Sequence, residues 1–163
     1  MLNIRPAIRD DACVILELIR GLAEYERALH AVTATEADIV RDGFSGEPRF
    51  YCVIADWDGV PAGFAFYFFH YSTWLGKPGL YLEDLFVKPH MRGKGIGKAL
   101  LVYLAQIGVR ENCYGMRWQV LDWNQPAIDF YEKLGAKIIR EWLDVRITGE
   151  SLRALADSKG VSG

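Results

Sequence analysis

A glycine-rich, basic segment joins two apolar patterns in the middle of this 163-residue chain. The segment MRGKGIGKAL, residues 91–100, follows the strand-like GLYLEDLFV (79–87) and opens an apolar helical pattern over about 95–111. Glycine adopts positive φ and carries no side chain, so neighbouring backbone N–H groups can turn toward one point. At the start of a helix such groups bind anions, and basic side chains strengthen the site. The sequence therefore predicts a strand, an anion-binding loop for a phosphate or pyrophosphate, and a helix in succession.

Two well-known phosphate-binding loops fit this segment poorly. A P-loop has the spacing GxxxxGK[ST], but Arg92 stands at the first glycine position and Ala99 at the magnesium-binding hydroxyl position. A dinucleotide fingerprint needs GxGxxG in a first βαβ unit, whereas this chain has GxGxG after a hairpin pattern. A tight strand-to-helix turn with solvated lysines remains an alternative that involves no ligand.

The N-terminal part predicts one strand followed by two helices. The expected bounds are residues 2–8 for the strand, about 11–29 for the first helix and about 33–41 for the second. Asp10 or Asp11 can cap the first helix. Thr33 and Glu36 form a capping-box pair for the second helix, which Gly43 ends.

The remaining patterns complete an α/β fold. Strands are expected over 49–57, 62–71, 79–87, 116–123 and 136–147, and further helices over 126–134 and 149–158. Asp58-Gly59 predicts a hairpin between the first two of these strands, and Pro126 and Gly135 mark the start and end of a helix. The order β-α-α-β-β-β-α-β-α-β predicts a mixed central β-sheet flanked by helices, in one domain that covers residues 1–163.

Composition excludes several classes of function. Apolar residues make up 51% of the chain and the net charge is −2, which argues for a globular fold and against a dedicated nucleic-acid binder. Cys13, Cys52 and Cys113 form neither a disulfide framework nor a zinc motif, and the histidines have no metal-binding spacing. The longest apolar run is too short for a membrane span, and the N-terminus is too charged for a signal peptide. We expect a soluble, cytoplasmic protein with no metal and with neither nucleic acid nor membrane as a partner.

Several blocks of sequence together resemble one enzyme superfamily. In VKPHMRGKGIG, the positions of Val87, Arg92, Gly95 and Gly97 resemble the acetyl-CoA signature V/I-x4-Q/R-x-x-G-x-G/A of the GNAT superfamily of N-acetyltransferases. The blocks GLAEYE, DGF, FYFFHYSTWLGKPGLYLEDLFV, RGKGIGKALL and LDWNQPAIDFYEKLGA look like the diamine (spermidine/spermine) N-acetyltransferases and their thialysine-acetylating relatives. The resemblance covers nearly the whole chain and implies a single-domain GNAT acetyltransferase fold. It also implies that the protein forms a homodimer.

The resemblance implies a binding site for acetyl-CoA as cosubstrate. The backbone of Leu85, Phe86 and Val87 would pair with the pantetheine arm, and a backbone N–H there could polarise the thioester carbonyl. The pyrophosphate would bind at the glycine segment, and a second contact would come from the start of the next helix. The residues implied at these two places are Arg92, Gly93, Lys94, Gly95, Ile96, Gly97 and Lys98, and then Asn124, Gln125, Pro126 and Ala127.

The implied acceptor is a primary amine of a small molecule. A lysine-like amine has a pKa of about 10.4, so an acid near it both attracts the cation and relays its proton. By resemblance, Glu83 assists this deprotonation and Tyr131 protonates the departing CoA thiolate. Adjacent carboxylates on a strand point to opposite faces, so at most one of Glu83 and Asp84 faces the thioester. Tyr25, Glu26 and Trp74 match positions that line the acceptor site, with Glu83 and Asp84 beside them.

Alternatives remain open at this stage. Spermidine, a shorter diamine and a thialysine-like amino acid are all compatible, because Asp56 to Pro61 make a short hairpin turn and KIIREWLDV replaces an acid-rich stretch of the polyamine enzymes. The residues predict direct attack, because the three cysteines lie in apolar segments that disfavour the thiolate needed for an acetyl-enzyme. A catalytically silent CoA sensor and an enzyme that modifies protein amines are the other two interpretations.

Overall fold

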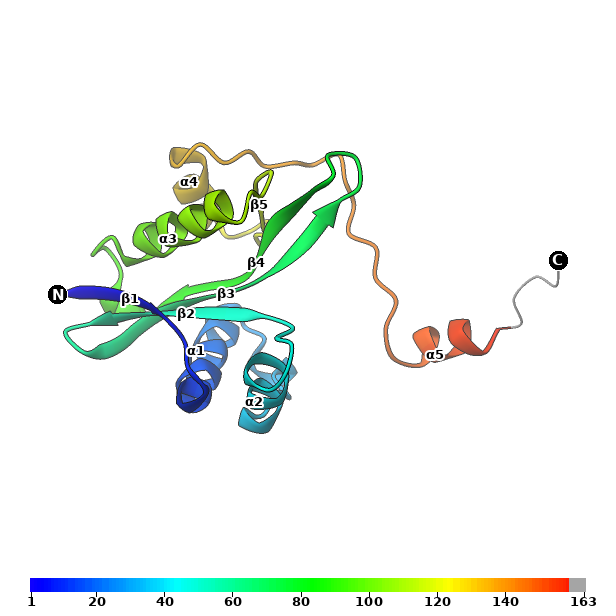
Figure 1. Cartoon of the computed structure of the whole chain (residues 1–163), viewed down its shortest axis with the longest axis horizontal. Helices are drawn as coiled ribbons and strands as arrows, with labels where there is room; N and C mark the ends of the chain where they lie inside the picture. The colour runs from blue at the N-terminus through cyan, green and yellow to red at the C-terminus, as the bar shows by residue number, and fades with distance from the viewer. Residues whose placement is uncertain (159–163) are drawn as a thin grey trace. The chain divides into compact units, whose positions relative to one another are not determined.

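One mixed β-sheet organises the computed structural model, which describes residues 1–158 (Figure 1). The strands are β1 (Leu2–Pro6), β2 (Tyr51–Trp57), β3 (Val60–Ser72), β4 (Lys77–Val87) and β5 (Met116–Arg117). The α-helices are α1 (Ala12–Tyr25), α2 (Glu36–Phe44), α3 (Ile96–Arg110), α4 (Gln125–Lys133) and α5 (Gly149–Asp157). Short 3-10 turns lie at Arg9–Asp11 (η1), Leu29–Ala31 (η2) and Pro89–Met91 (η3). The predicted α/β fold with a mixed central sheet and flanking helices is confirmed.

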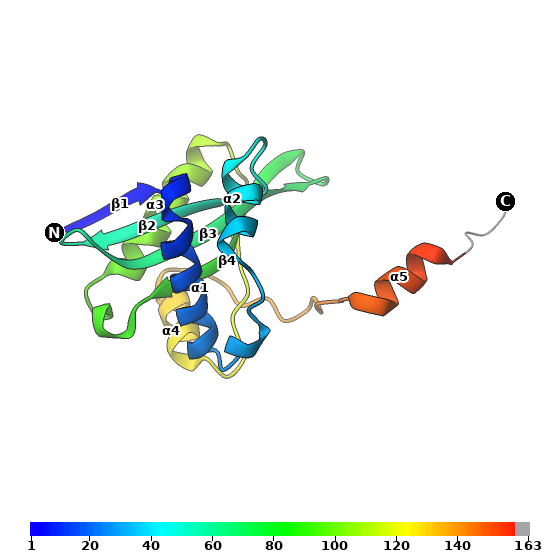
Figure 2. The same ribbon diagram turned by 90° about the horizontal axis from the view of Figure 1, so that it is seen from below.

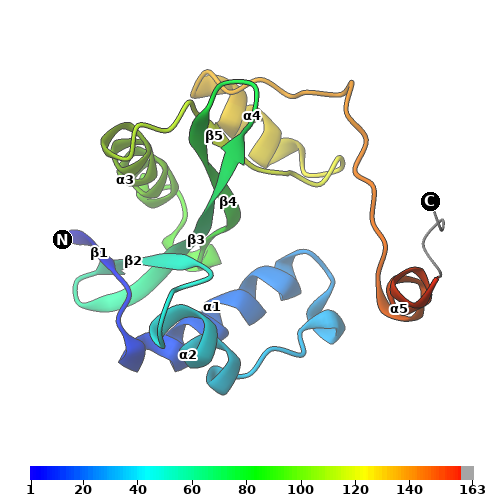
Figure 3. The ribbon, with the colours of Figure 1, turned by 45° about the vertical axis from the view of Figure 1, so that its right-hand side comes forward.

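The strands follow chain order across the sheet, β1-β2-β3-β4-β5. The first four are antiparallel neighbours, and β5 runs parallel to β4 after the crossover helix α3. Helices α1 and α2 cover one face of the sheet and α3 covers the other, as the two side views make plain (Figures 1 and 3). From below, α1 and α2 lie in front of the strands (Figure 2). The sheet is thus a buried middle layer.

The core on the α1 face is a continuous apolar cluster. Ile15 and Leu18 of α1 pack against Ile54, Phe64 and Phe86 of the central strands, and all five are buried. Gly21 lies against the Phe86 ring, where an added Cβ would come within 2.8 Å of it. This close approach brings the C-terminal end of α1 next to β4, where the acidic residues lie.

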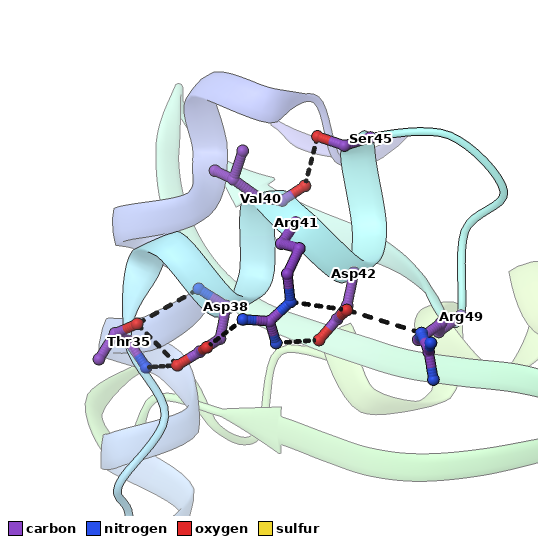
Figure 4. A network of polar contacts seen from close by, with 7 residues as sticks. All are labelled: Thr35, Asp38, Val40, Arg41, Asp42, Ser45 and Arg49. Atoms are coloured by element: carbon purple, nitrogen blue, oxygen red, sulfur yellow. Dashed lines mark hydrogen bonds and ion pairs between the residues drawn. The ribbon is translucent and has the colours of Figure 1, made fainter.

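Polar side chains fix the start and end of α2 (Figure 4). Thr35 and Asp38 form a reciprocal capping box: Asp38 N–H donates to Thr35 Oγ1 over 3.2 Å, and Thr35 N–H donates to Asp38 Oδ2 over 2.9 Å. Arg41 bridges Asp38 and Asp42. The capping box predicted from Thr33 and Glu36 is therefore wrong: the helix starts two residues later, where the reciprocal pair can form.

Four other sequence predictions need correction. The first helix ends at Tyr25 rather than near residue 29, because Arg27 has a φ of 60°. Asp11 precedes α1 but makes no cap bond there, because its carboxylate binds Arg5. Gly43 lies inside α2, where it makes room for the Phe50 ring. Of residues 116–123 only Met116–Arg117 pairs with β4.

The prediction of a last strand over residues 136–147 is wrong. That stretch carries no strand in the described structure and bends at residues 141–142, and residues 139–147 are exposed throughout. A strand needs a hydrogen-bonded neighbour, and the described residues offer none to this segment. The terminal helix expected over 149–158 is confirmed as α5.

The chain divides into two compact units, Met1–Gln119 and the part from Val120 onward. The first holds the whole sheet with α1, α2 and α3, and the second holds α4 and α5. Among residues 1–158, no helix is both long enough and apolar enough to cross a bilayer.

Candidate active site

The glycine loop, residues 92–98, has the backbone that an anion site requires. Gly93 and Gly95 have φ values of 78° and 79°, in the left-handed region that glycine adopts freely. Gly95 is the N-cap residue of α3, so the amides of Ile96, Gly97 and Lys98 open the helix without intrahelical acceptors. A Cβ at Gly93 or Gly95 would meet no atom within 4 Å. The loop thus presents several N–H groups, together with the positive end of the α3 dipole, to open space.

The loop cations are held by neighbouring groups. The Arg92 guanidinium carbon lies 4.4 Å from the centre of the Tyr25 ring, and Arg92 Nε donates to the Val87 carbonyl over 3.1 Å. The ammonium of Lys94 lies 4.8 Å from the centre of the Trp57 ring. Two cations of the loop are therefore oriented by aromatic rings from α1 and β2.

A shallow hollow of about 370 Å³ borders the loop. Its lining includes Gly95 and Lys98 at the start of α3, Tyr103 two turns along, and Ile4 of β1. The hollow thus places one lysine beside apolar side chains, a combination that suits a ligand with both an anionic and an apolar group.

One edge of β4 is open next to the loop. Strand β4 pairs with β3 along its length up to Val87, but with β5 only at Leu80 and Tyr81. Within residues 1–158, no strand pairs with the other edge of Leu82–Val87. The backbone groups of Leu85, Phe86 and Val87 on that edge are thus placed to bond an extended, amide-containing ligand.

A β-bulge sits in the middle of β4. Phe66 of β3 pairs with Asp84 and Tyr67 pairs with Leu82, so Glu83 is the extra residue between them. Bulges re-aim side chains, and this one breaks the simple alternation along the strand. Glu83 is exposed, whereas Asp84 is half-buried on the α1 face beside Phe66.

Three carboxylates gather where α1 ends against β4. Burial raises the pKa of Asp84 to about 7, and the negative charges of Glu83 and Glu26 add to the effect. Burial also raises the pKa of Glu26, the C-cap residue that follows α1. Among residues 1–158, no basic side chain forms an ion pair with any of these three acids. Such a cluster attracts a cation from solution.

The raised pKa of Asp84 makes folding stability depend on pH. Its folded pKa lies above its ordinary value of 3.8, so ionised Asp84 destabilises the fold progressively as the pH rises from about 4 through 7. We expect Asp84→Asn to stabilise the protein by about 2 kcal/mol at pH 8 and by little at pH 4. The gain at pH 8 is roughly half of what the full pKa shift implies, because the side chain is only half-buried. Urea unfolding at the two pH values measures this. Glu47→Gln, at an exposed acid in the loop before β2, is the control, and an equal gain for Asp84→Asn at both pH values would refute the assignment.

The structure separates Trp74 from the acids. Trp74 lies in the turn between β3 and β4 and is 91% exposed, at the tip of a long hairpin. Six residues of β4, from Lys77 to Leu82, lie between this turn and Glu83. Tyr25, Glu26, Glu83 and Asp84 come together in the first unit, and Trp74 does not join them there.

The second unit carries the other predicted residues on α4. Asn124 is buried and caps the helix, with its side-chain oxygen accepting from Ala127 N–H over 3.4 Å. Gln125 Nε2 donates to Asp129 Oδ1 over 2.6 Å, and Pro126 occupies the first turn. Tyr131 is buried on the same helix, with its ring 5.4 Å from that of Phe130. Asn124 therefore has a clear structural role as a helix cap.

Two features of the site were not predicted from the sequence. Trp57 was read only as part of a strand, and its contact with Lys94 joins residues far apart in the chain. The bulge at Glu83 depends on the register of two strands, which no local pattern encodes. The signal for Asp84 was present, because an acid between apolar neighbours in LEDLF is costly unless it has a role.

Comparison with known proteins decides the family. A profile of the acetyltransferase (GNAT) family matches residues 15–136, which covers most of the chain and extends from the first unit into the α4 part of the second. The chain belongs to the GNAT acetyltransferase family. Its relatives include the thialysine N-epsilon-acetyltransferase of Sus scrofa, 40% identical, with 94% of this chain and 96% of that protein aligned. The spermidine/spermine N(1)-acetyltransferase-like protein 1 of Homo sapiens is 42% identical over 82% of this chain but only 20% of its own length.

Solved structures agree with this acetyltransferase fold. An integron cassette protein from the mobile metagenome of V. cholerae superposes with a TM-score of 0.81 and 28% identity, covering 96% of this chain and 98% of that one. This GNAT protein is accordingly an acyltransferase of the N-acetyltransferase class, in a family whose cosubstrate is acetyl-CoA.

Proposed function

We propose that this GNAT enzyme transfers the acetyl group of acetyl-CoA to a primary amine of a small molecule: a diamine, a polyamine or a thialysine-like amino acid. The names of the relatives from Sus scrofa and Homo sapiens support this substrate class. The observation that carries the proposal is the placement of three uncompensated carboxylates beside the open edge of β4. A cationic amine would bind these acids next to the strand that would hold the thioester.

The residues present fit acetyl-CoA. The glycine loop offers backbone N–H groups and the cations of Arg92, Lys94 and Lys98 to a pyrophosphate. The open edge of Leu85–Val87 offers peptide groups to the pantetheine amides. When bound, acetyl-CoA supplies the thioester carbon that the amine attacks. We propose that both compact units serve one acetyltransferase domain, which the family match across residues 15–136 supports.

Glu83 is the proposed proton acceptor. The substrate ammonium first loses one proton to the Glu83 carboxylate, directly or through water. The neutral amine nitrogen then forms a bond to the acetyl carbon while the C–S bond breaks, and the second proton lost by the nitrogen passes to solvent. The exposure of Glu83 at the bulge supports exchange of that proton with solvent. Asp84 and Glu26 attract the cation, because their burial without a basic partner favours a positive ligand.

Tyr131 is the proposed proton donor to the leaving thiolate. A phenol is a suitable donor because its own pKa, about 10, lies near that of a thiol. Direct attack agrees with the state of two cysteines, since burial raises the pKa of the Cys52 thiol strongly and that of the Cys113 thiol as well. Cys13 is exposed, contrary to the expectation that all three cysteines are buried in apolar segments. Asn124 and the first turn of α4 would add contacts to acetyl-CoA.

A panel of amines tests the proposed function. CoA release from acetyl-CoA, followed with a thiol reagent, would be measured with putrescine, spermidine, spermine, thialysine, lysine and a protein-derived peptide amine. Turnover of one or more of the small amines is the expected result. Turnover of the peptide alone would move the acceptor class to proteins, and silence across the panel with acetyl-CoA bound would indicate a CoA sensor.

We propose that the protein is a homodimer. In the second unit, Leu143, Val145 and Ile147 fall on alternate positions after a bend at residues 141–142, and Ile139 precedes that bend. These four apolar side chains are 47–92% exposed. An exposed group of apolar side chains of this kind is costly in water and typical of a surface that a partner covers.

We also propose a cytoplasmic location for this protein, which its free cysteines support.

Light scattering after size-exclusion chromatography tests the dimer. The wild-type chain should elute as a dimer, and Leu143→Lys with Val145→Lys should give a monomer because two charges replace exposed apolar side chains. Arg146→Glu, on the alternate face of the same stretch, is the control and should remain dimeric. A monomeric wild-type protein would refute the proposal.

A further inference from the structure

Two aromatic rings hold the cations of the glycine loop. Arg92 precedes Gly93 and Lys94 follows it, and both glycines of this stretch, Gly93 and Gly95, have positive φ. A loop with two such glycines has wide conformational freedom, so its basic side chains need external support to stay in one place. The support comes from different elements: Tyr25 is the last residue of α1, and Trp57 is the last residue of β2.

The contact of Arg92 is the better defined of the two. Its guanidinium lies over the face of Tyr25, and its Nε bonds the Val87 carbonyl at the end of β4. Nearby, Lys88 Nζ lies 2.8 Å from Glu17 Oε1, which ties the start of the connection to α1 as well. Arg92 is thus fixed between α1 and β4, with the rest of its planar guanidinium free to bond a phosphate.

We propose that Tyr25 and Trp57 are positioning residues for the binding of acetyl-CoA. Tyr25 orients Arg92, and Trp57 orients Lys94, before the pyrophosphate binds to the glycine loop. This inference rests on the proposed function of the glycine loop. In this proposal Tyr25 contributes to the binding of acetyl-CoA, whereas the sequence resemblance predicted that Tyr25 lines the acceptor site. Trp57 has no role in the sequence-based account.

The physical reason is preorganisation. When the binding-competent state is only partly populated, the apparent Kd rises by the inverse of that fraction. A partly exposed cation–π contact changes such a population by about two- to fivefold. Loss of the Tyr25 ring should therefore weaken acetyl-CoA binding by about that factor without changing how the amine is recognised.

Isothermal titration of acetyl-CoA in the absence of amine tests the Tyr25 contact. Tyr25→Leu should raise the Kd about two- to fivefold, and Tyr25→Phe, which keeps the ring, should leave it near wild type. In an Arg92→Met background, Tyr25→Leu should have no further effect, because the cation that it seats is gone. The amine KM at saturating acetyl-CoA should be unchanged in Tyr25→Leu.

Trp57 is tested through its partner, because Trp57→Leu could also disturb the sheet edge. Lys94→Met removes the cation and leaves the ring, and Trp57→Phe keeps an aromatic surface. Lys94→Met should raise the Kd for acetyl-CoA, and Trp57→Leu should add nothing in that background.

The measurements separate a failure of the proposed function from a failure of the role given to Tyr25. A wild-type protein that does not bind acetyl-CoA would overturn the proposed function. Normal binding by wild type with an unchanged Kd in Tyr25→Leu, or a tighter one, would overturn this inference alone. A raised amine KM with an unchanged Kd would return Tyr25 to the acceptor site.

Discussion

Glu83→Gln should lower kcat about a hundredfold to a thousandfold at pH 7, because general base catalysis contributes factors of this size. The variant keeps the shape of the side chain but cannot accept the ammonium proton. The defect should shrink as the pH rises toward 10, since the free amine then forms in solution without the enzyme's help. Steady-state CoA release over pH 6–10 with saturating acetyl-CoA measures both effects.

Asp84→Asn is the matched control for Glu83→Gln. It removes the neighbouring carboxylate, whose pKa is raised to about 7, so that about half of these side chains carry a negative charge at neutral pH. We expect it to raise the amine KM more than it lowers kcat, because its charge attracts the cation. The opposite pattern, with kcat lost in Asp84→Asn and retained in Glu83→Gln, would assign proton transfer to Asp84.

Tyr131→Phe should reduce kcat about a hundredfold while the Kd for acetyl-CoA stays within about twofold of wild type. The substitution removes one hydroxyl from a buried ring on α4, so packing against Phe130 is kept. Without a donor the thiolate must leave unprotonated, which slows C–S cleavage but not binding. Rapid-quench turnover and titration calorimetry separate the two quantities.

Tyr71→Phe provides the control for the loss of a tyrosine hydroxyl. Tyr71 lies near the tip of the β3–β4 hairpin and is 63% exposed. Its variant should turn over like wild type. A loss of kcat and of acetyl-CoA affinity to the same degree in Tyr131→Phe would mean that Tyr131 supports binding rather than proton transfer.

Local sequence signals predicted most of the fold of the first unit. Asp58-Gly59 marked the hairpin turn, and both residues have positive φ in the structure. The glycine loop and α3 were placed to within one residue, because strand, turn and helix signals agree there. The start of α2 was misplaced because Thr33 and Thr35 offer competing caps, and only geometry decides between them.

The predictions failed where the outcome depends on distant partners. Residues 136–147 have strand-like composition, yet strand formation needs a neighbour that composition does not supply. The bulge that exposes Glu83 comes from the pairing of β3 with β4. The contact between Lys94 and the Trp57 ring forms because the end of β2 lies close to the glycine loop. Site residues could be named from motif resemblance, but their burial and charge environment required the folded chain.

The most direct test of the account is the initial velocity of CoA release, measured while acetyl-CoA and the best amine are both varied. Direct attack in a ternary complex predicts a rate that requires amine and double-reciprocal lines that intersect. Parallel lines would indicate an acetyl-enzyme and would contradict the roles given to Glu83 and Tyr131. Release that does not depend on amine would contradict the central claim that this protein acetylates a small primary amine.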